Sequence, residues 1–170
     1  MSVPDNTKVR RVERHEYQYG GFEVMGDCGV CGHTQDSPIH DALLQYRYRE
    51  DAWRIFVCCI LLNQTTRAQV DRVVRRVFAL WPDAYAMRDA SLRALARELA
   101  GQGMEWVKAG RLIRMSDDYV VWYETGAMLP DQIHGVGQYA IDSYDIFFCK
   151  AETDVPSGDK ELLAYVGRKA

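Results

Sequence analysis

A tight glycine turn between two helix-forming segments constrains the fold more than any other part of this chain. Pro130 can occupy the first turn of a short helix before the turn, and Gln138 begins a second helix after it. Gly135 and Gly137 frame a turn that is too tight for side chains. Unpaired backbone N–H groups in such a turn, and at the start of the second helix, bind an anion without reading a sequence. Residues 129–148 therefore predict a helix-hairpin-helix unit that holds a phosphate backbone, and DNA is the obvious partner.

The rest of the chain carries helical patterns and a single, weak strand signal at Gly20-Gly21. Asp51 caps residues 52–62, which are apolar on all sides and therefore predict a buried central helix. Thr66 and Gln69 form a capping box for the next helix, which ends at Trp81-Pro82. We expect further helices over residues 38–46, 104–123 and 159–166, and one that starts at Ser91 and is terminated by Gly101. The fold class is therefore all-α with short connections.

The composition indicates one compact domain behind an N-terminal extension. The chain has 170 residues, of which 48% are hydrophobic, so one core can form without disulfide or metal crosslinks. Residues 1–37 are polar, glycine-rich and at first basic, and we expect an extension that is partly disordered or forms a cysteine-containing hairpin. Residues 38–170 then make up the helical domain.

The sequence has the features of an intracellular protein. No segment approaches the ~20 apolar residues that span a bilayer, and the charged, aromatic N-terminal residues do not resemble a signal peptide. The cysteine count is odd, at five, and two of them, Cys58 and Cys59, are adjacent in an apolar run, which is unlike a secreted disulfide framework. We expect a monomer of the cytoplasm, nucleoid or nucleus, without a membrane partner.

The net charge of −3 argues against a protein that coats nucleic acid, because non-specific binding needs many cations. Local basic patches are still compatible with this charge. We interpret each of two basic clusters as a solvated helix face; their members are Arg67, Arg72, Arg75 and Arg76 in one cluster, and Lys108, Arg111 and Arg114 in the other.

One half of a zinc-binding pattern lies in the N-terminal extension. Cys28 and Cys31 have the spacing of a zinc knuckle, and His33 and His40 could complete a set of four ligands. The second cysteine pair of such a motif is missing. A glycine-rich loop with reduced thiols is therefore the favoured interpretation, and zinc is a weak candidate.

The order of several separated motifs resembles the helix-hairpin-helix DNA glycosylase superfamily of the endonuclease III type. Within it, the chain is most similar to the thymine or mismatch glycosylase domain that occurs with methyl-CpG-binding domains. The likeness covers residues 40–168 and rests on Trp53-Arg54, Leu61-Leu62-Asn63-Gln64-Thr65, Trp81-Pro82, His134-Gly135-Val136-Gly137-Gln138-Tyr139, and Asp142-Ser143-Tyr144 with Ile146-Phe147. The resemblance implies two helical lobes around a DNA-binding cleft.

The resemblance also implies that a nucleotide is flipped out of duplex DNA and that side chains fill the gap. Gln64, next to Asn63, would occupy the vacated stack, and Met104 would wedge beside the orphaned partner base. The alternative for Gln64 is a solvated residue between helices, and for Met104 it is a filler of core gaps. The remaining DNA contacts would come from Gly135, Val136, Gly137, Gln138 and Lys160.

Asp159 matches the catalytic carboxylate of this superfamily. Cleavage of the bond between base and sugar builds positive charge on the sugar, which a nearby carboxylate stabilises. The alternative is that Asp159 only caps the last helix, after Ser157-Gly158. The two roles are compatible, because a capping position can hold a carboxylate firmly at the edge of a cleft.

Tyr139 stands where strand-cleaving members carry a lysine that forms a Schiff base. Because tyrosine cannot form an imine, we expect a monofunctional enzyme in which Tyr139 lines the base pocket. Lys160, beside Asp159, is the alternative amine. No cysteine follows Cys149, so no iron–sulfur cluster is expected. No cofactor is expected either, although the resemblance allows a monovalent cation at the hairpin.

Three functions remain open from the sequence. The favoured one is a DNA glycosylase of base excision repair that removes a thymine- or uracil-type base, mispaired or modified at position 5. An alternative is a transferase that builds modified thymines in DNA on the same scaffold, as proposed for related bacteriophage proteins. The third is a non-catalytic helix-hairpin-helix module that binds DNA with a steep salt dependence.

Overall fold

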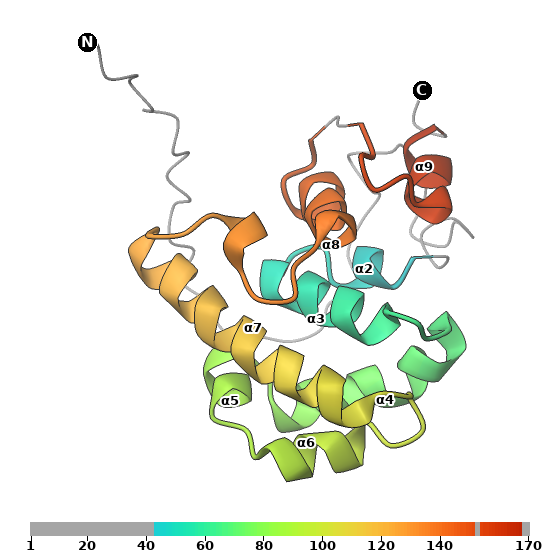
Figure 1. Ribbon diagram of the computed structural model, residues 1–170. Coiled ribbons are helices and arrows are strands. Elements are labelled where there is room, and N and C mark those ends of the chain that lie inside the picture. The colour runs from blue at the N-terminus through green and yellow to red at the C-terminus, as the bar shows by residue number, and fades with distance from the viewer. Residues whose placement is uncertain (1–42, 152–153, 168–170) are drawn as a thin grey trace.

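The computed structural model describes residues 43–151 and 154–167, and within these ranges the secondary structure is helical without a strand. The helices, shown in Figure 1, are α2 (Leu44–Arg47), α3 (Ala52–Leu62), α4 (Arg67–Leu80), α5 (Ala84–Arg88), α6 (Leu92–Glu98), α7 (Glu105–Thr125), the 3-10 helix η1 (Pro130–Gln132), α8 (Gln138–Ser143), the π-helical turn η2 (Tyr144–Phe148) and α9 (Lys160–Gly167). The predicted all-α fold is confirmed.

Helix α3 is the centre of the structure. The carboxylate of Asp51 accepts a hydrogen bond from the backbone N–H of Arg54 (3.0 Å), so the predicted cap is present. The α3 side chains are buried from Ala52 to Leu61, with Arg54 as the exception, because helices α2, α4, α7 and α8 pack around it. Trp53 donates its indole N–H to the hydroxyl of Ser116 in α7 (2.8 Å). This bond fixes the long helix against the central one.

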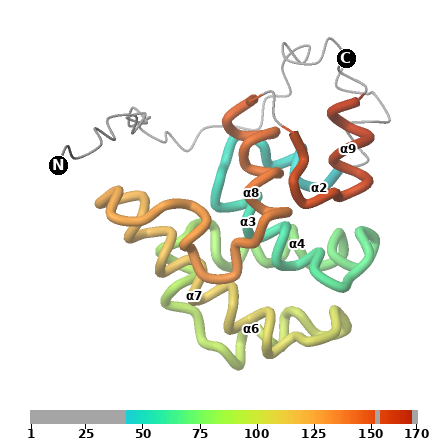
Figure 2. Tube along the Cα trace, turned by 45° about the horizontal axis from the view of Figure 1, so that its top comes forward, coloured from blue at the N-terminus to red at the C-terminus, as the bar shows by residue number. Residues whose placement is uncertain are grey.

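The remaining helices form two lobes on either side of α3 (Figures 1 and 2). In one lobe, α5 and α6 pack against α7, and α4 packs against α6. In the other, an aromatic cluster joins α2, η2 and α9: the ring centroids of Phe147 and Tyr165 are 5.0 Å apart, and Tyr46 lies 6.3 Å from each. In the hairpin motif, α8 packs against α3, and η1 packs against α8.

Several helices begin or end at the capping residues expected from the sequence. The capping box of Thr66 and Gln69 is formed at the start of α4. Ser91 caps α6 through the backbone N–H of Ala94 (3.4 Å). Helix α7 ends at Gly126, whose φ of 63° is the left-handed conformation that favours glycine. Each of these signals is local in the chain.

The elements of the structure differ in four respects from those expected. The helix expected over residues 38–46 does not include Leu43, which is extended, and α2 runs only from Leu44 to Arg47. The helix after Ser91 ends at Glu98, before Gly101. Helix α5 was not expected, although Asp83 caps it through the N–H of Ala86 (2.8 Å). The second hairpin helix continues from α8 into the π-helical turn η2.

Some expectations lie outside the described residues. These are the extension 1–37, the Gly20-Gly21 hairpin and the zinc candidates Cys28, Cys31, His33 and His40. Over residues 43–151 and 154–167, no group of three or more histidine, cysteine, aspartate or glutamate side chains is placed to hold a metal. No helix in the same ranges combines the length and apolar character needed to cross a bilayer.

Candidate active site

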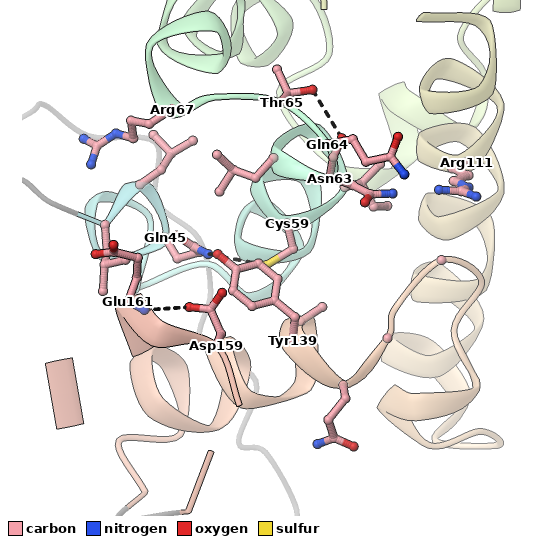
Figure 3. A pocket seen from close by; sticks show the side chains of 18 residues that line it. Gln45, Cys59, Asn63, Gln64, Thr65, Arg67, Arg111, Tyr139, Asp159 and Glu161 are labelled. Carbon is pink, nitrogen blue, oxygen red and sulfur yellow. Dashed lines mark hydrogen bonds between the residues drawn. The ribbon is translucent and has the colours of Figure 1, made fainter. Parts of the chain in front are cut away.

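A cavity of about 620 Å³ opens between α3, the hairpin and the start of α9 (Figure 3). Its volume is in the range of roughly 300–1,000 Å³ that is usual for ligand sites. The cavity brings together seven of the residues singled out in the sequence: Asn63, Gln64, Gly135, Gly137, Gln138, Tyr139 and Asp159. The structure therefore gathers residues that lie almost 100 positions apart in the chain.

Asp159 both caps α9 and lines the cavity. One carboxylate oxygen, Oδ1, accepts hydrogen bonds from the backbone N–H groups of Glu161 and Leu162, each at 3.0 Å. The side chain lies beside the ring of Tyr139 in Figure 3. The two roles expected for Asp159 are thus geometrically compatible, because the cap fixes the carboxylate at the cavity wall.

A buried aspartate connects the hairpin helix to the segment that carries Asp159. Asp142 is 2% exposed. Its Oδ1 accepts from the amide of Gln138 (2.8 Å), and its Oδ2 accepts from the backbone N–H of Ser157 (2.9 Å). The Ser157 hydroxyl in turn accepts from the N–H of Asp159 (3.4 Å). This chain of hydrogen bonds fixes Asp159 relative to Tyr139.

Tyr139 presents a neutral phenol to the cavity. Burial raises the pKa of its hydroxyl well above the ordinary value. The hydroxyl accepts a short hydrogen bond from Nε2 of Gln45. The Gln45 amide also faces the hydroxyl of Ser143 (3.5 Å) and the sulfur of Cys59 (3.8 Å). A polar edge made of amide, phenol, hydroxyl and thiol groups therefore lies at this end of the cavity.

Gln45 is the residue that sequence reasoning missed. It is fully buried, and its Oε1 has no hydrogen-bond partner among the described residues. A buried amide oxygen without a partner is unfavourable unless a ligand satisfies it. The available signal was a single polar residue in the run Leu43-Leu44-Gln45-Tyr46.

The hairpin turn is less open than expected. The N–H of His134 donates to Asp118 of α7 (2.8 Å), and that of Val136 donates to the carbonyl of Ile133 (3.1 Å). The side chain of Val136 is also buried, at 7% exposure, and the expected contact of this residue with DNA stays a prediction. Within the turn and the start of α8, no acceptor among the described residues is found for the backbone N–H groups of Gly135, Gly137, Gln138 and Tyr139.

Gly135 sits close to the two helices behind the turn. Its φ of +78° is left-handed, and a Cβ atom there would lie 3.6 Å from Ile60 and 3.8 Å from the Cβ of Arg111. Arg111 lines the cavity from α7. The turn therefore packs against α3 and α7 and leaves one arginine beside it.

Gln64 and Met104 share an unusual backbone conformation. Their φ angles are 55° and 51°, in the left-handed region that non-glycine residues rarely adopt. Gln64 is exposed and lines the cavity, whereas Met104 does not line it. Met104 is 40% exposed at the start of α7, so the interpretation as a core filler is wrong.

The basic residues divide into exposed and buried ones. Lys160 is exposed and does not line the cavity. Arg67 lines the cavity and pairs with Asp71 at 3.1 Å. Lys108 is only 1% exposed, so its assignment to a solvated helix face is wrong. Helical spacing alone did not indicate which face of α7 is turned inward.

Two curated proteins and one solved structure are similar to this chain. No protein-family profile matches the chain. In sequence, the chain is 32% identical over 123 residues to the methyl-CpG-binding domain protein 4-like protein of Arabidopsis thaliana, which covers 72% of this chain and 27% of that protein. It is 29% identical over 131 residues to the thymine/uracil-DNA glycosylase of Pyrobaculum aerophilum, covering 74% of this chain and 55% of that protein.

A solved structure shares the fold. The structure of a thermostable thymine-DNA glycosylase superposes with a TM-score of 0.56 at 19% identity, covering 64% of this chain and 53% of that one. The chain thus spans about a quarter to about half the length of these curated relatives. The predicted resemblance to DNA glycosylases and the predicted fold are confirmed.

Proposed function

We propose that this chain, a relative of the helix-hairpin-helix DNA glycosylases, is a monofunctional DNA glycosylase. It would flip a thymine- or uracil-type base out of duplex DNA, mispaired or modified at position 5, and leave an abasic site. The observation that carries the proposal is the meeting of Asp159, Tyr139 and Gln45 in one cavity beside the hairpin turn. The names of the relatives, which include a thymine/uracil-DNA glycosylase, support the same class of base.

The polar edge of the cavity suits a thymine or uracil ring. The ring presents carbonyl oxygens on both sides of an N–H group, so it needs two donors around one acceptor. The unpartnered Oε1 of Gln45 can accept from that N–H, whereas its Nε2 already faces Tyr139, Ser143 and Cys59. The neutral phenol of Tyr139 can donate to the base as well. In cytosine the ring nitrogen N3 carries no hydrogen, so it cannot donate to this oxygen.

Asp159 would act on the sugar. Cleavage breaks the bond between C1′ and the base nitrogen; the electron pair leaves with the base, which takes up a proton. A water molecule then supplies its oxygen to C1′ and releases its proton to Asp159 or to solvent. The charge that develops on the sugar before water adds is stabilised by the carboxylate, which the α9 backbone holds in place.

The absence of a suitable amine supports a monofunctional reaction. A strand-cleaving enzyme needs a lysine amine within reach of C1′. Among the described residues that line the cavity there is no lysine, and Lys160, the alternative amine, is exposed outside the lining. Lys108 is occupied in a buried network. The abasic site would therefore remain uncut.

The surface around the cavity supports binding to double-stranded DNA. The free N–H groups of Gly135, Gly137 and Gln138 would hold a phosphate, and Arg111 beside them would add charge. Gln64 and Met104, exposed and held in strained conformations, would enter the duplex. Strain of this kind is commonly found at functional sites.

The experiment is single-turnover incubation with duplexes that carry G·T, G·U or 5-substituted uracil pairs, followed by analysis of the free base and by alkali, which cuts abasic sites. The proposal expects free base, and strand cuts only after alkali. Cuts before alkali would contradict the monofunctional reaction. A new modified nucleoside without free base would favour the transferase that builds modified thymines.

A further inference from the structure

A buried lysine joins the loop of Gln64, which lines the cavity, to the loop of Met104 before α7. Lys108 of α7 is 1% exposed, and in the described ranges it forms no ion pair with a carboxylate. Its Nζ donates to the carbonyls of Leu61 (2.9 Å) and Gln102 (3.3 Å), and it makes a short hydrogen bond to the hydroxyl of Thr65. An ammonium group has three N–H donors, so all three have oxygen acceptors.

The three acceptors come from two separate loops. Leu61 and Thr65 flank the loop that carries Gln64, and Gln102 belongs to the loop that carries Met104. The Thr65 hydroxyl also lies 3.0 Å from the Gln102 carbonyl, to which it donates. Because Lys108 bonds to both sides, its side chain sets the separation of the two loops.

The side chain of Gln102 extends the same network to α4. Gln102 is 4% exposed, and its amide donates to the carbonyl of Gln69 (2.7 Å). The amide of Gln69 lies 3.5 Å from the carbonyl of Gly101. The loop before Met104 is therefore held from α4 and from α7 together.

The two loops need such a constraint. Each carries a non-glycine residue in the left-handed region, Gln64 at φ 55° and Met104 at φ 51°. These conformations persist only where surrounding contacts determine the backbone. Neither Gln64 nor Met104 is buried, so the constraint must come from their neighbours in the chain, and the Lys108 network supplies it.

We infer that Lys108 is a positioning residue that sets the separation and direction of Gln64 and Met104, the two side chains that would enter the duplex. The inference rests on the proposed function for the meaning of those two residues. Lys108 itself cannot contact a phosphate, because it is buried. Its effect on DNA passes through the loops and not through its charge.

The variant Lys108→Met tests this inference, because methionine keeps the length of the side chain and removes its three donors. We expect the single-turnover rate of base release to fall about 10- to 100-fold, since a displacement of about 1 Å can cost ~100-fold in rate. Affinity for undamaged duplex should change less than about threefold, because the phosphate contacts are elsewhere.

A second measurement reports insertion without catalysis. A duplex with 2-aminopurine opposite a stable abasic-site analogue gains fluorescence when side chains unstack the orphaned base. Wild-type protein should give this gain, and Lys108→Met should lose most of it. Lys108→Arg, which restores donors, should recover part of it, and Thr65→Val, which removes one acceptor, should reproduce part of the loss.

Arg114→Met is the matched control, because Arg114 is an exposed cation on the same helix. It should leave the fluorescence gain unchanged. If Lys108→Met is folded and gives the wild-type gain and rate, or if Arg114→Met causes an equal loss, the inference is wrong. Should Lys108→Met fail to fold, an unchanged gain in Thr65→Val would overturn it.

The outcomes separate this inference from the proposed function. A wild-type protein that shows the fluorescence gain but releases no base contradicts the glycosylase proposal alone. The inference would then still be decided by the variants. A wild-type protein with neither signal would contradict both.

Discussion

Gln45 and Tyr139, 94 positions apart in the chain, are joined by a short hydrogen bond from the Gln45 amide to the Tyr139 hydroxyl. The bond crosses from α2 to α8 at one end of the cavity. It turns the other atom of the amide, Oε1, into a buried acceptor without a partner among the described residues. We propose that this pair recognises the thymine- or uracil-type base of the proposed reaction.

Replacing Gln45 with leucine removes this acceptor and leaves the cavity similar in size. We expect base release from a G·U duplex to slow about 10- to 100-fold, because the flipped base loses a hydrogen bond on which its recognition depends. The measurement is the single-turnover rate. Arg93→Leu, at an exposed residue of α6 outside the cavity, is the control and should keep the wild-type rate. Equal rates for the two variants would remove Gln45 from base recognition.

Replacing Asp142 with asparagine should loosen the segment that carries Asp159. The asparagine NH₂ group faces one of the two donors, from Gln138 or Ser157, and cannot accept from it. We expect a loss of about 1–3 kcal/mol in the free energy of unfolding. Base release should slow as well.

Denaturant unfolding and single-turnover rates measure the two effects of Asp142→Asn. The control is Asp131→Asn, at an exposed aspartate of η1, which should change neither quantity. A wild-type rate in a destabilised Asp142→Asn protein would show that Asp142 supports the fold without positioning Asp159.

The stability of the protein should fall as the pH rises above about 9. Burial raises the pKa of the Cys59 thiol to about 12. It also raises the pKa values of Cys58, Tyr139 and Tyr144. A cysteine thiol in the unfolded chain has a pKa of ~8.5. Between these values the unfolded state loses protons first, so the unfolded state gains stability.

The loss of stability should not exceed about 1.4 kcal/mol per pH unit for each group. Melting temperatures measured between pH 7.5 and 10.5 test this expectation, and Cys59→Ser should flatten the decline because a serine hydroxyl does not titrate there. A melting temperature that stays constant over this range would contradict the burial of these groups.

Local signals in the sequence predicted much of the fold. Asp51, and the pair Thr66 and Gln69, mark helix starts correctly because a cap involves only residues within one turn. Asp159 is likewise a cap in the structure. The family motifs added the expectation that Asp159 and Tyr139 share a site, and the cavity contains both.

Contacts between distant residues could not be predicted in the same way. The sequence gives no indication that Gln45 meets Tyr139, because the pairing depends on how α2 packs beside α8. Lys108 was assigned to the wrong face of α7 for a related reason: its spacing from Arg111 and Arg114 is helical, but tertiary packing decides which side is buried. Val136 also turned inward, because the turn packs onto the core.

The most direct test of the account compares wild-type protein with Asp159→Asn on G·T and G·U duplexes. Asparagine is as good a helix cap as aspartate, so this change removes the carboxylate and keeps the fold. The account predicts base release by the wild type, strand cuts only after alkali, and a rate for Asp159→Asn lower by at least about 100-fold at an unchanged melting temperature. Base release by Asp159→Asn at the wild-type rate, or none by the wild type on any duplex, would contradict it.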